Sequence, residues 1–197
     1  MRRTSSGMPV LAIIALPLLL LAASPASAQK RSSADVGVSW ALLAESDMTL
    51  PVGWVVAVAG HITDQLGIVG EVGGNYKSVT PVPTLPGSAA GVSVDVSEHS
   101  FLGGARFAFG GNAKVRPFVQ ALVGMSRLSG GASVSGVDVG MSINALTVQP
   151  GAGFDVQIGP RVSVRLQADC RWMTLQDIGS GWQYRLATGV VFALGGR

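Results

Sequence analysis

The sequence alternates between apolar and polar residues in a series of segments that begin near residue 35 and end near residue 194. An alternation with a period of two is the signature of a β-strand whose two faces meet different surroundings. It is clearest in residues 148–158, where apolar side chains alternate with Gln, Gly and Asp. The pattern predicts eight strands, at Asp35–Leu43, Gly53–His61, Leu66–Lys77, Glu98–Phe109, Pro117–Arg127, Val148–Ile158, Val162–Trp172 and Trp182–Leu194.

The connections between the predicted strands alternate in length. Three are short turns, around Asp64, at Gly110-Gly111-Asn112 and at Gly159-Pro160. The other four are longer and cover about residues 44–52, 78–97, 128–144 and 174–181. Transmembrane barrels show this asymmetry, with short turns at one end and long loops at the other. We therefore predict an all-β fold, a closed eight-stranded antiparallel up-and-down transmembrane β-barrel. Pro150 argues mildly against its strand and is tolerated there if its missing donor falls at a bulge or at a lightly paired position.

The polar face of the predicted strands indicates which side of the barrel meets lipid. It is rich in Gly and small residues, and its acidic and basic side chains are nearly balanced. Eight strands leave an interior that side chains just fill, so we expect this face to line the lumen and the apolar face to meet lipid. We expect the inward charges to bridge the lumen; an open channel is the alternative. The expected lumen charge network is Glu71, Arg106, Asp155, Arg165, Asp169, Arg171 and Arg185, on a face that also carries Glu98.

The Trp and Tyr residues support the lipid-facing assignment. In the meander they gather toward the long-loop end of the strands and on the apolar face. Amphipathic aromatic rings concentrate where a membrane meets water, because both the ring and its polar group are satisfied there. The predicted membrane-interface aromatics are Trp40, Trp54, Tyr76, Trp172, Trp182 and Tyr184.

The N-terminal segment has a different pattern. Arg2 and Arg3 precede the apolar run Val10–Ala23, and small residues follow at Ala26-Ser27-Ala28. This order is typical of a secretory signal peptide. We therefore expect residues 1–28 to be cleaved and residues 29–197 to form the outer-membrane barrel domain.

Composition narrows the classes of function further. Charged residues make up 13% of the chain, about half the usual share of a soluble domain. The net charge of +3 falls to about +1 without Arg2 and Arg3, so the sequence predicts no nucleic-acid partner. Cys170 is the one cysteine, which excludes an intrachain disulfide and a four-cysteine zinc site.

Residues 34–195 resemble the eight-stranded outer-membrane β-barrel superfamily, the group of the OmpA transmembrane domain and the OmpX/Ail type. The resemblance is carried by the signal peptide and by the segments Val36–Trp40, Arg116–Gly124 and Tyr184–Leu194. It implies a place in a Gram-negative outer membrane, among outer-membrane lipid and lipopolysaccharide. It also implies insertion by the barrel-assembly machinery.

Catalytic motifs are absent from the sequence. It contains no phosphate-binding Walker loop, no GxSxG elbow and no HExxH pair. His99 and Ser100 invite comparison with lipid-modifying barrels, but adjacent strand residues point to opposite faces. We therefore predict a non-enzymatic structural or surface-interaction protein with no cofactor and no metal. The alternatives are a lipid-modifying outer-membrane enzyme, a small pore and a soluble calycin-like ligand carrier.

Two of the predicted long loops themselves alternate strictly, at Gly91–Glu98 and Val137–Ile143. Strands of about 10 residues already cross a bilayer. These extra residues should therefore continue three strands above the membrane as a protruding sheet; the alternative is a pair of Gly/Ser loops. An exposed sheet edge can capture an extended peptide. We accordingly predict an adhesin-like surface with an extracellular protein partner at residues 78–97 and 128–144.

Overall fold

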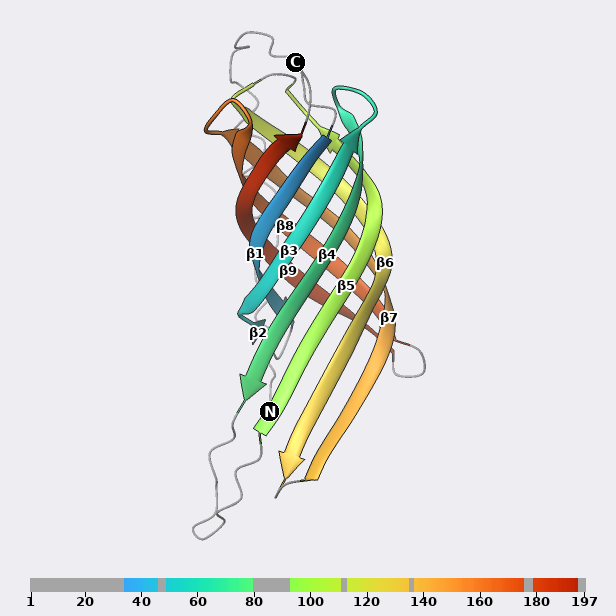
Figure 1. Cartoon of the computed structure of the whole chain (residues 1–197). Coiled ribbons are helices and arrows are strands. Elements are labelled where there is room, and N and C mark those ends of the chain that lie inside the picture. Colours follow the sequence, from blue (N-terminus) through green and yellow to red (C-terminus); the bar gives the residue numbers. More distant parts are fainter. Residues whose placement is uncertain are drawn as a thin grey trace, which may run out of the picture.

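The computed structural model describes residues 34–45, 49–79, 93–110, 113–134, 137–175 and 179–194. Its strands form one closed antiparallel sheet (Figure 1). The barrel closes where β1 pairs with β9, from Ala34 opposite Leu194 to Glu45 opposite Gln183. The predicted barrel of eight long antiparallel strands is thus confirmed. The strands are β1 (Ala34–Glu45), β2 (Thr49–Leu50), β3 (Val52–His61), β4 (Leu66–Val79), β5 (Ser93–Ala108), β6 (Val115–Val134), β7 (Val137–Gln157), β8 (Val162–Leu175) and β9 (Gly179–Leu194).

Proline interrupts the hydrogen-bonded ladder in two places. Pro51 separates the two-residue strand β2, which pairs only with β1 within the described residues, from the long strand β3. Pro150 pairs with Ala121 of β6, but the ladder between β7 and β8 skips Gln149 and Pro150. Pro150 therefore lies at a lightly paired position, one of the two placements at which a strand tolerates a proline, which cannot donate to a ladder.

The turns at one end of the barrel are short. Ile62–Gln65 join β3 to β4, and residues 158–161 join β7 to β8. Gly110 follows β5 with a φ of 80°, a left-handed conformation that glycine adopts without steric cost. We call this end, at the top of Figure 1, the turn end, and the opposite end the loop end.

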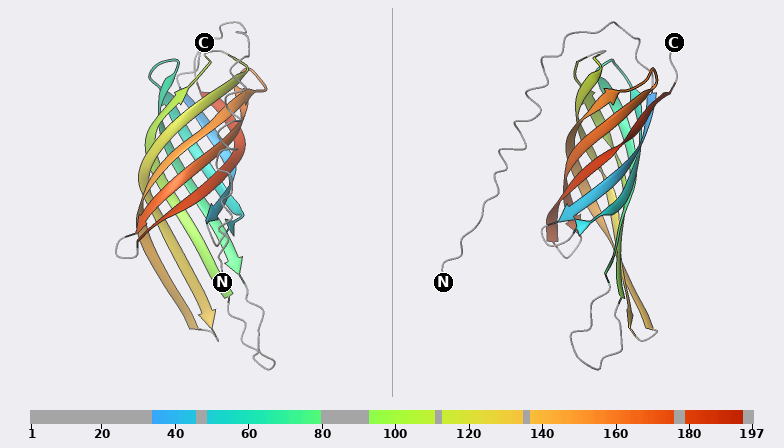
Figure 2. Two further views of the ribbon diagram at one scale, coloured as in Figure 1. Left: turned by 180° about the vertical axis from the view of Figure 1, so that it is seen from behind. Right: turned by 90° about the vertical axis from the view of Figure 1, so that its left-hand side faces the viewer.

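The strands β5, β6 and β7 continue beyond the rest of the barrel at the loop end (Figures 1 and 2). The sequence interpretation treated residues 128–144 as a connection between barrel strands that carries strand extensions. In the structure β6 and β7 pair throughout this region, from Leu128 opposite Ile143 to Val134 opposite Val137. Strand β5 joins them, with Ser93 opposite Ser133. The three-stranded extension is therefore present, and residues 128–134 and 137–144 are strand residues rather than a loop.

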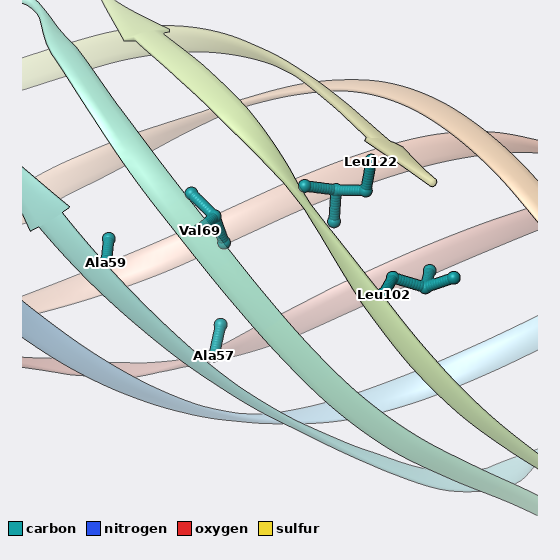
Figure 3. Packing of buried hydrophobic residues seen from close by; sticks show 5 residues of the cluster. All are labelled: Ala57, Ala59, Val69, Leu102 and Leu122. Atoms are coloured by element: carbon teal, nitrogen blue, oxygen red, sulfur yellow. The ribbon is translucent and has the colours of Figure 1, made fainter. Parts of the chain in front are cut away.

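The burial of side chains alternates along the strands. On β9, Gln183, Arg185 and Ala187 are buried, whereas Trp182, Tyr184 and Leu186 are exposed. A small cluster of buried apolar side chains from β3, β4, β5 and β6 packs together inside the barrel (Figure 3). Its members are Ala57, Ala59, Val69, Leu102 and Leu122.

Glycines on the inner face allow adjacent strands to approach closely. A Cβ atom added to Gly104 would overlap the carbonyl oxygen of Ala121, and one added to Gly124 would overlap that of Phe101. Larger residues at these two positions would force the strands apart. This explains part of the glycine content of the lumen-facing pattern.

Candidate functional site

The centre of the lumen is crossed by an arginine that binds two carboxylates. Arg185 of β9 donates from Nη2 to Glu71 Oε1 of β4 at 2.7 Å and to Asp169 Oδ2 of β8 at 2.8 Å. Gln149 donates to the same Glu71 oxygen at 3.1 Å, and Gln167 donates to both oxygens of Asp169. All five residues are buried, so the two carboxylates are held by a cation and by neutral amides.

A second ion pair lies nearer the loop end. Arg171 Nη1 of β8 lies 2.6 Å from Glu98 Oε1 of β5. Arg171 also donates to Gln183 and Ser126, and Gln183 donates to Glu98 at 3.4 Å. The predicted network omits Glu98, although the alternation had already placed it on the polar face.

A third cluster lies nearer the turn end. Arg165 of β8 forms a bidentate pair with Asp155 of β7, at 2.7 and 2.9 Å. Its Nη2 atom also lies 3.9 Å from a carboxylate oxygen of Asp35, whose other oxygen is 3.3 Å from His61 Nε2. The two parallel hydrogen bonds between Arg165 and Asp155 are the strong form of a charged hydrogen bond.

Arg106 connects this third cluster to the centre of the lumen. It donates twice to Gln120 Oε1, at 3.1 and 2.8 Å, and Gln120 donates on to Asp169 at 3.3 Å. Two guanidinium groups approach the ring of Phe118, with Arg106 at 4.5 Å and Arg165 at 5.0 Å from its centroid. The ring thus contacts both cations by cation–π interaction.

The seven residues of the predicted lumen network all point inward, and the contacts above place them at three levels along the barrel. Arg165 with Asp155, Arg185 with Glu71 and Asp169, and Arg171 with Glu98 each join different strands. An eight-stranded interior is only wide enough for side chains to fill. That these bridges block conduction stays a prediction.

The six predicted interface aromatics all lie on the outer face. Trp54 Nε1 donates to the Tyr76 hydroxyl at 3.3 Å, and that hydroxyl lies 3.1 Å from His99 Nε2. Trp172 and Trp182 meet edge to face with centroids 4.7 Å apart. Trp40 is paired with Trp54 in the ladder, and Tyr184 is paired with Cys170.

The outer face of β5, β6 and β7 changes from apolar to polar toward the loop end. Phe101, Met125 and Leu146 are neighbours across the three strands and are 60%, 55% and 55% exposed. The next outward-facing row consists of His99, Arg127 and Asn144, and the one beyond it of Ser97, Ser129 and Ser142. The belt suited to lipid therefore ends between the first and second of these rows.

The inner face changes in the opposite sense. The row of Glu98, Leu128 and Ile143 is followed toward the loop end by the row of Val96, Gly130 and Met141. A sheet with a polar outer face and an apolar inner face has the normal polarity of a soluble sheet. The extension beyond Glu98 thus has the opposite polarity to the barrel body.

The extended part of β7 has a free edge among the described residues. Its ladder with β8 begins at Ala145, opposite Leu175, so Val137–Asn144 pair with β6 alone. An edge strand of this kind presents backbone N–H and C=O groups that can accept another strand. This edge is the clearest structural opportunity for a partner in the described part of the molecule.

Catalytic and metal-binding geometry is not found in the described part of the chain. His99 points outward, whereas the adjacent Ser100 is buried inside the barrel, so the two do not meet. No group of three or more His, Cys, Asp or Glu side chains in the described residues is placed to hold a metal ion. Nor do those residues include a helix long and apolar enough to cross a membrane.

Comparison with known proteins gives a fold-level likeness. No protein-family model matches the chain, and no curated protein matches it. The attachment invasion locus protein Ail of Yersinia pestis, solved with the heparin analogue sucrose octasulfate, has a TM-score of 0.54 and 19% identity. That alignment covers 82% of this chain and 97% of Ail.

Two further solved structures agree. Neisserial surface protein A matches with a TM-score of 0.54 and 13% identity, over 82% of this chain and 96% of its own. A major outer membrane protein from Thermus thermophilus matches with a TM-score of 0.53 and 13% identity, over 81% and 98%. The predicted resemblance is confirmed at the level of fold: the chain is a closed eight-stranded barrel of the kind that outer-membrane proteins form.

Proposed function

We propose that this protein is a non-enzymatic outer-membrane barrel that presents the extension of β5, β6 and β7 as a docking surface outside the cell. The observation that carries the proposal is the free edge of β7 at Val137–Asn144, which pairs with β6 alone among the described residues. An extended peptide can add to such an edge through main-chain hydrogen bonds. The protein is then an adhesin-like or partner-docking molecule whose partner is an extended segment of another protein.

The polarity of the barrel supports a place in a membrane. Val38, Ile68, Leu166 and similar side chains are exposed on the barrel body, while charged residues fill the lumen. A soluble ligand carrier has the reverse arrangement, with its apolar face inside. We infer export through the predicted signal peptide, insertion by the barrel-assembly machinery, and outer-membrane lipid and lipopolysaccharide as the surroundings.

The lumen supports a role that does not depend on transport. Two ion pairs cross the interior, Arg185 with Glu71 and Arg171 with Glu98, and a third, Arg165 with Asp155, joins the adjacent strands β8 and β7. We infer that these bridges plug the barrel, so that function resides at the loop end. One of the similar proteins supports a role at the cell surface: Ail is an attachment invasion locus protein, and it was solved with the heparin analogue sucrose octasulfate.

Display on the surface of a non-adherent Gram-negative host tests the proposal. The variant deletes residues 131–140 and joins the paired residues Gly130 and Met141 through an Asn-Gly turn, which favours a tight hairpin. The control shortens the connection between β8 and β9 at residues 176–178. Cells that carry the full chain should adhere to cultured epithelial cells, and the hairpin deletion should abolish this at equal surface level.

Adherence that is absent, or that survives the hairpin deletion, would contradict the docking role. A purified host protein that binds only the full chain should also slow amide exchange at Val137–Asn144. Unchanged exchange at this edge in the complex would contradict strand addition as the mode of binding.

A further inference from the structure

A shallow hollow of about 380 Å³ lies on the extension of β5, β6 and β7, beside the row that ends the apolar belt. Its outward-facing residues form two rows across the three strands, Ser97 with Ser129 and Ser142, and Asp95 with Gly131 and Gly140. We call these six residues the outer hollow. Gly130 and Met141 complete its lining.

The shape and chemistry of the outer hollow suit a sugar. Gly131 lacks a side chain, and a Cβ atom placed there would meet nothing within 4 Å, so the glycines leave real space. Three serine hydroxyls can each donate and accept, and the carboxylate of Asp95 accepts from hydroxyl donors. A sugar ring fits such a lining, because its C–H groups can lie on the glycine backbone while its hydroxyl groups reach the serines and Asp95.

A cation borders the outer hollow on the side of the apolar belt. Arg127 Nη2 donates to Ser142 Oγ at 3.0 Å, and His99 is the ladder partner of Arg127 on β5. Tyr76 holds His99 by the 3.1 Å contact between its hydroxyl and Nε2. Within the described strands, Arg127 is the one arginine or lysine on the outer face, and it lies next to the row of Phe101, Met125 and Leu146.

We propose that the outer face of β5, β6 and β7 binds, at the outer hollow and the bordering Arg127 and His99, the phosphorylated sugar headgroup of a glycolipid from the leaflet around the loop end. The acyl chains lie on Phe101, Met125 and Leu146, which are exposed on the barrel. The phosphate accepts hydrogen bonds from Arg127 and His99, the charge-assisted type that is shorter and stronger than a neutral one. The sugar occupies the outer hollow, so the order of rows matches the order of chemical groups in the lipid.

The inference rests on the membrane-spanning part of the proposed function and not on strand addition, because it uses the face of the sheet and not the edge of β7. Its failure would leave the adherence result untouched. It also commits to a lipid and not to a free phosphorylated sugar, since a soluble ligand gains nothing from the apolar row.

The test uses the full mature chain folded into phosphatidylcholine nanodiscs and titrated with a bisphosphorylated disaccharide lipid. Binding is followed by native mass spectrometry. Arg127→Gln should raise the apparent Kd about tenfold, the effect of losing one hydrogen bond to a charged group. Gly131→Val should weaken binding similarly, because it fills the outer hollow without meeting a neighbour within 4 Å at Cβ.

Two matched variants serve as controls. Arg161→Gln removes an exposed arginine at the turn end, and Gly70→Val adds a side chain on the outer face where nothing lies within 4 Å. Both should bind like the wild type. With the dephosphorylated lipid, Arg127→Gln should bind no worse than the wild type.

Equal affinity of the wild type, Arg127→Gln and Gly131→Val would overturn the proposal. Competition by the soluble bisphosphorylated disaccharide, at the concentration at which the lipid binds, would overturn the assignment to a membrane lipid. Heat-modifiable gel mobility verifies that each variant is folded. A loss of binding is then due to the change at the binding surface and not to unfolding.

Discussion

At the scale of single residues, Arg185 has the greatest consequence for the lumen. The residue is 1% exposed, and its side chain contacts Glu71 and Asp169 on two other strands. A buried ion pair contributes little net stability, because desolvating the charges offsets their attraction. Removing one partner is different, because the remaining charge then has no compensation. Substituting Arg185 therefore tests whether its ion pairs with Glu71 and Asp169 are closed to water in the folded barrel.

Arg185→Gln should lower the free energy of unfolding by about 3–5 kcal/mol, because two buried carboxylates lose their cation. Urea unfolding in phospholipid vesicles measures the change. The triple variant Arg185→Met, Glu71→Gln, Asp169→Asn should recover part of the loss. A loss under about 1 kcal/mol for the single variant would show that water reaches this site and that the bridge is open.

The outer face allows an equally direct test of the membrane assignment. Leu166 is 46% exposed in the middle of β8, and Thr174 is an exposed residue on the same face nearer the loop end. Leu166→Arg should destabilise the folded barrel in vesicles by about 2–4 kcal/mol, the cost of arginine at the bilayer midplane. Thr174→Arg should cost about 0–1 kcal/mol, since that position lies near the interface. Equal effects would contradict the lipid-facing assignment.

At the scale of elements, the extension of β5, β6 and β7 separates what the pattern could predict from what it could not. The period of two correctly assigned the inward and outward faces, because that assignment needs only local alternation. It placed residues 128–144 between two barrel strands, although Leu128 and Ile143 are ladder partners. How far a strand extends depends on whether a neighbouring strand pairs with it. Ser129 belongs to β6 because it pairs with Ser142 of β7, a partner that local alternation does not reveal.

Amide hydrogen exchange in detergent should show this extension as an edge-strand pattern. Residues 128–133 of β6 lie between two strands and should exchange slowly. In Val137–Asn144, every second amide should be protected, because alternate N–H groups of an antiparallel edge strand point away from the partner. Uniformly fast exchange there, with the barrel body protected, would contradict both the hairpin and the docking surface.

At the scale of the whole molecule, the partners of each charge depend on how the barrel closes. The alternation placed Glu71 and Arg185 on the polar face, but the two residues lie 114 positions apart in the chain. Their contact follows from the pairing of β1 with β9, which brings the ends of the sheet together. Local periodicity carries no information on that register. For the same reason, Glu98 could be placed inside the barrel but not assigned to Arg171.

Closure also determines whether the molecule can conduct ions. The interior is bridged at two levels, by Arg185 with Glu71 and by Arg171 with Glu98, and Arg165 links Asp155 and Asp35 of β7 and β1 at a third. Since eight strands leave room only for side chains, each of the two crossing pairs should obstruct the lumen without help from the other. Planar-bilayer recordings of the purified protein should therefore show no large, steady channel.

The double variant Arg171→Ala, Glu98→Ala makes this last prediction specific. It removes the bridge nearest the loop end and both of its charges, so no buried carboxylate is left without its partner. The variant should stay closed in the same recordings, because Arg185 and Glu71 still cross the lumen. Stable conductance in the wild type would show that the lumen is a pore, whereas conductance in the variant alone would make Arg171 and Glu98 its gate. Either result would move the function from the loop-end surface to the interior.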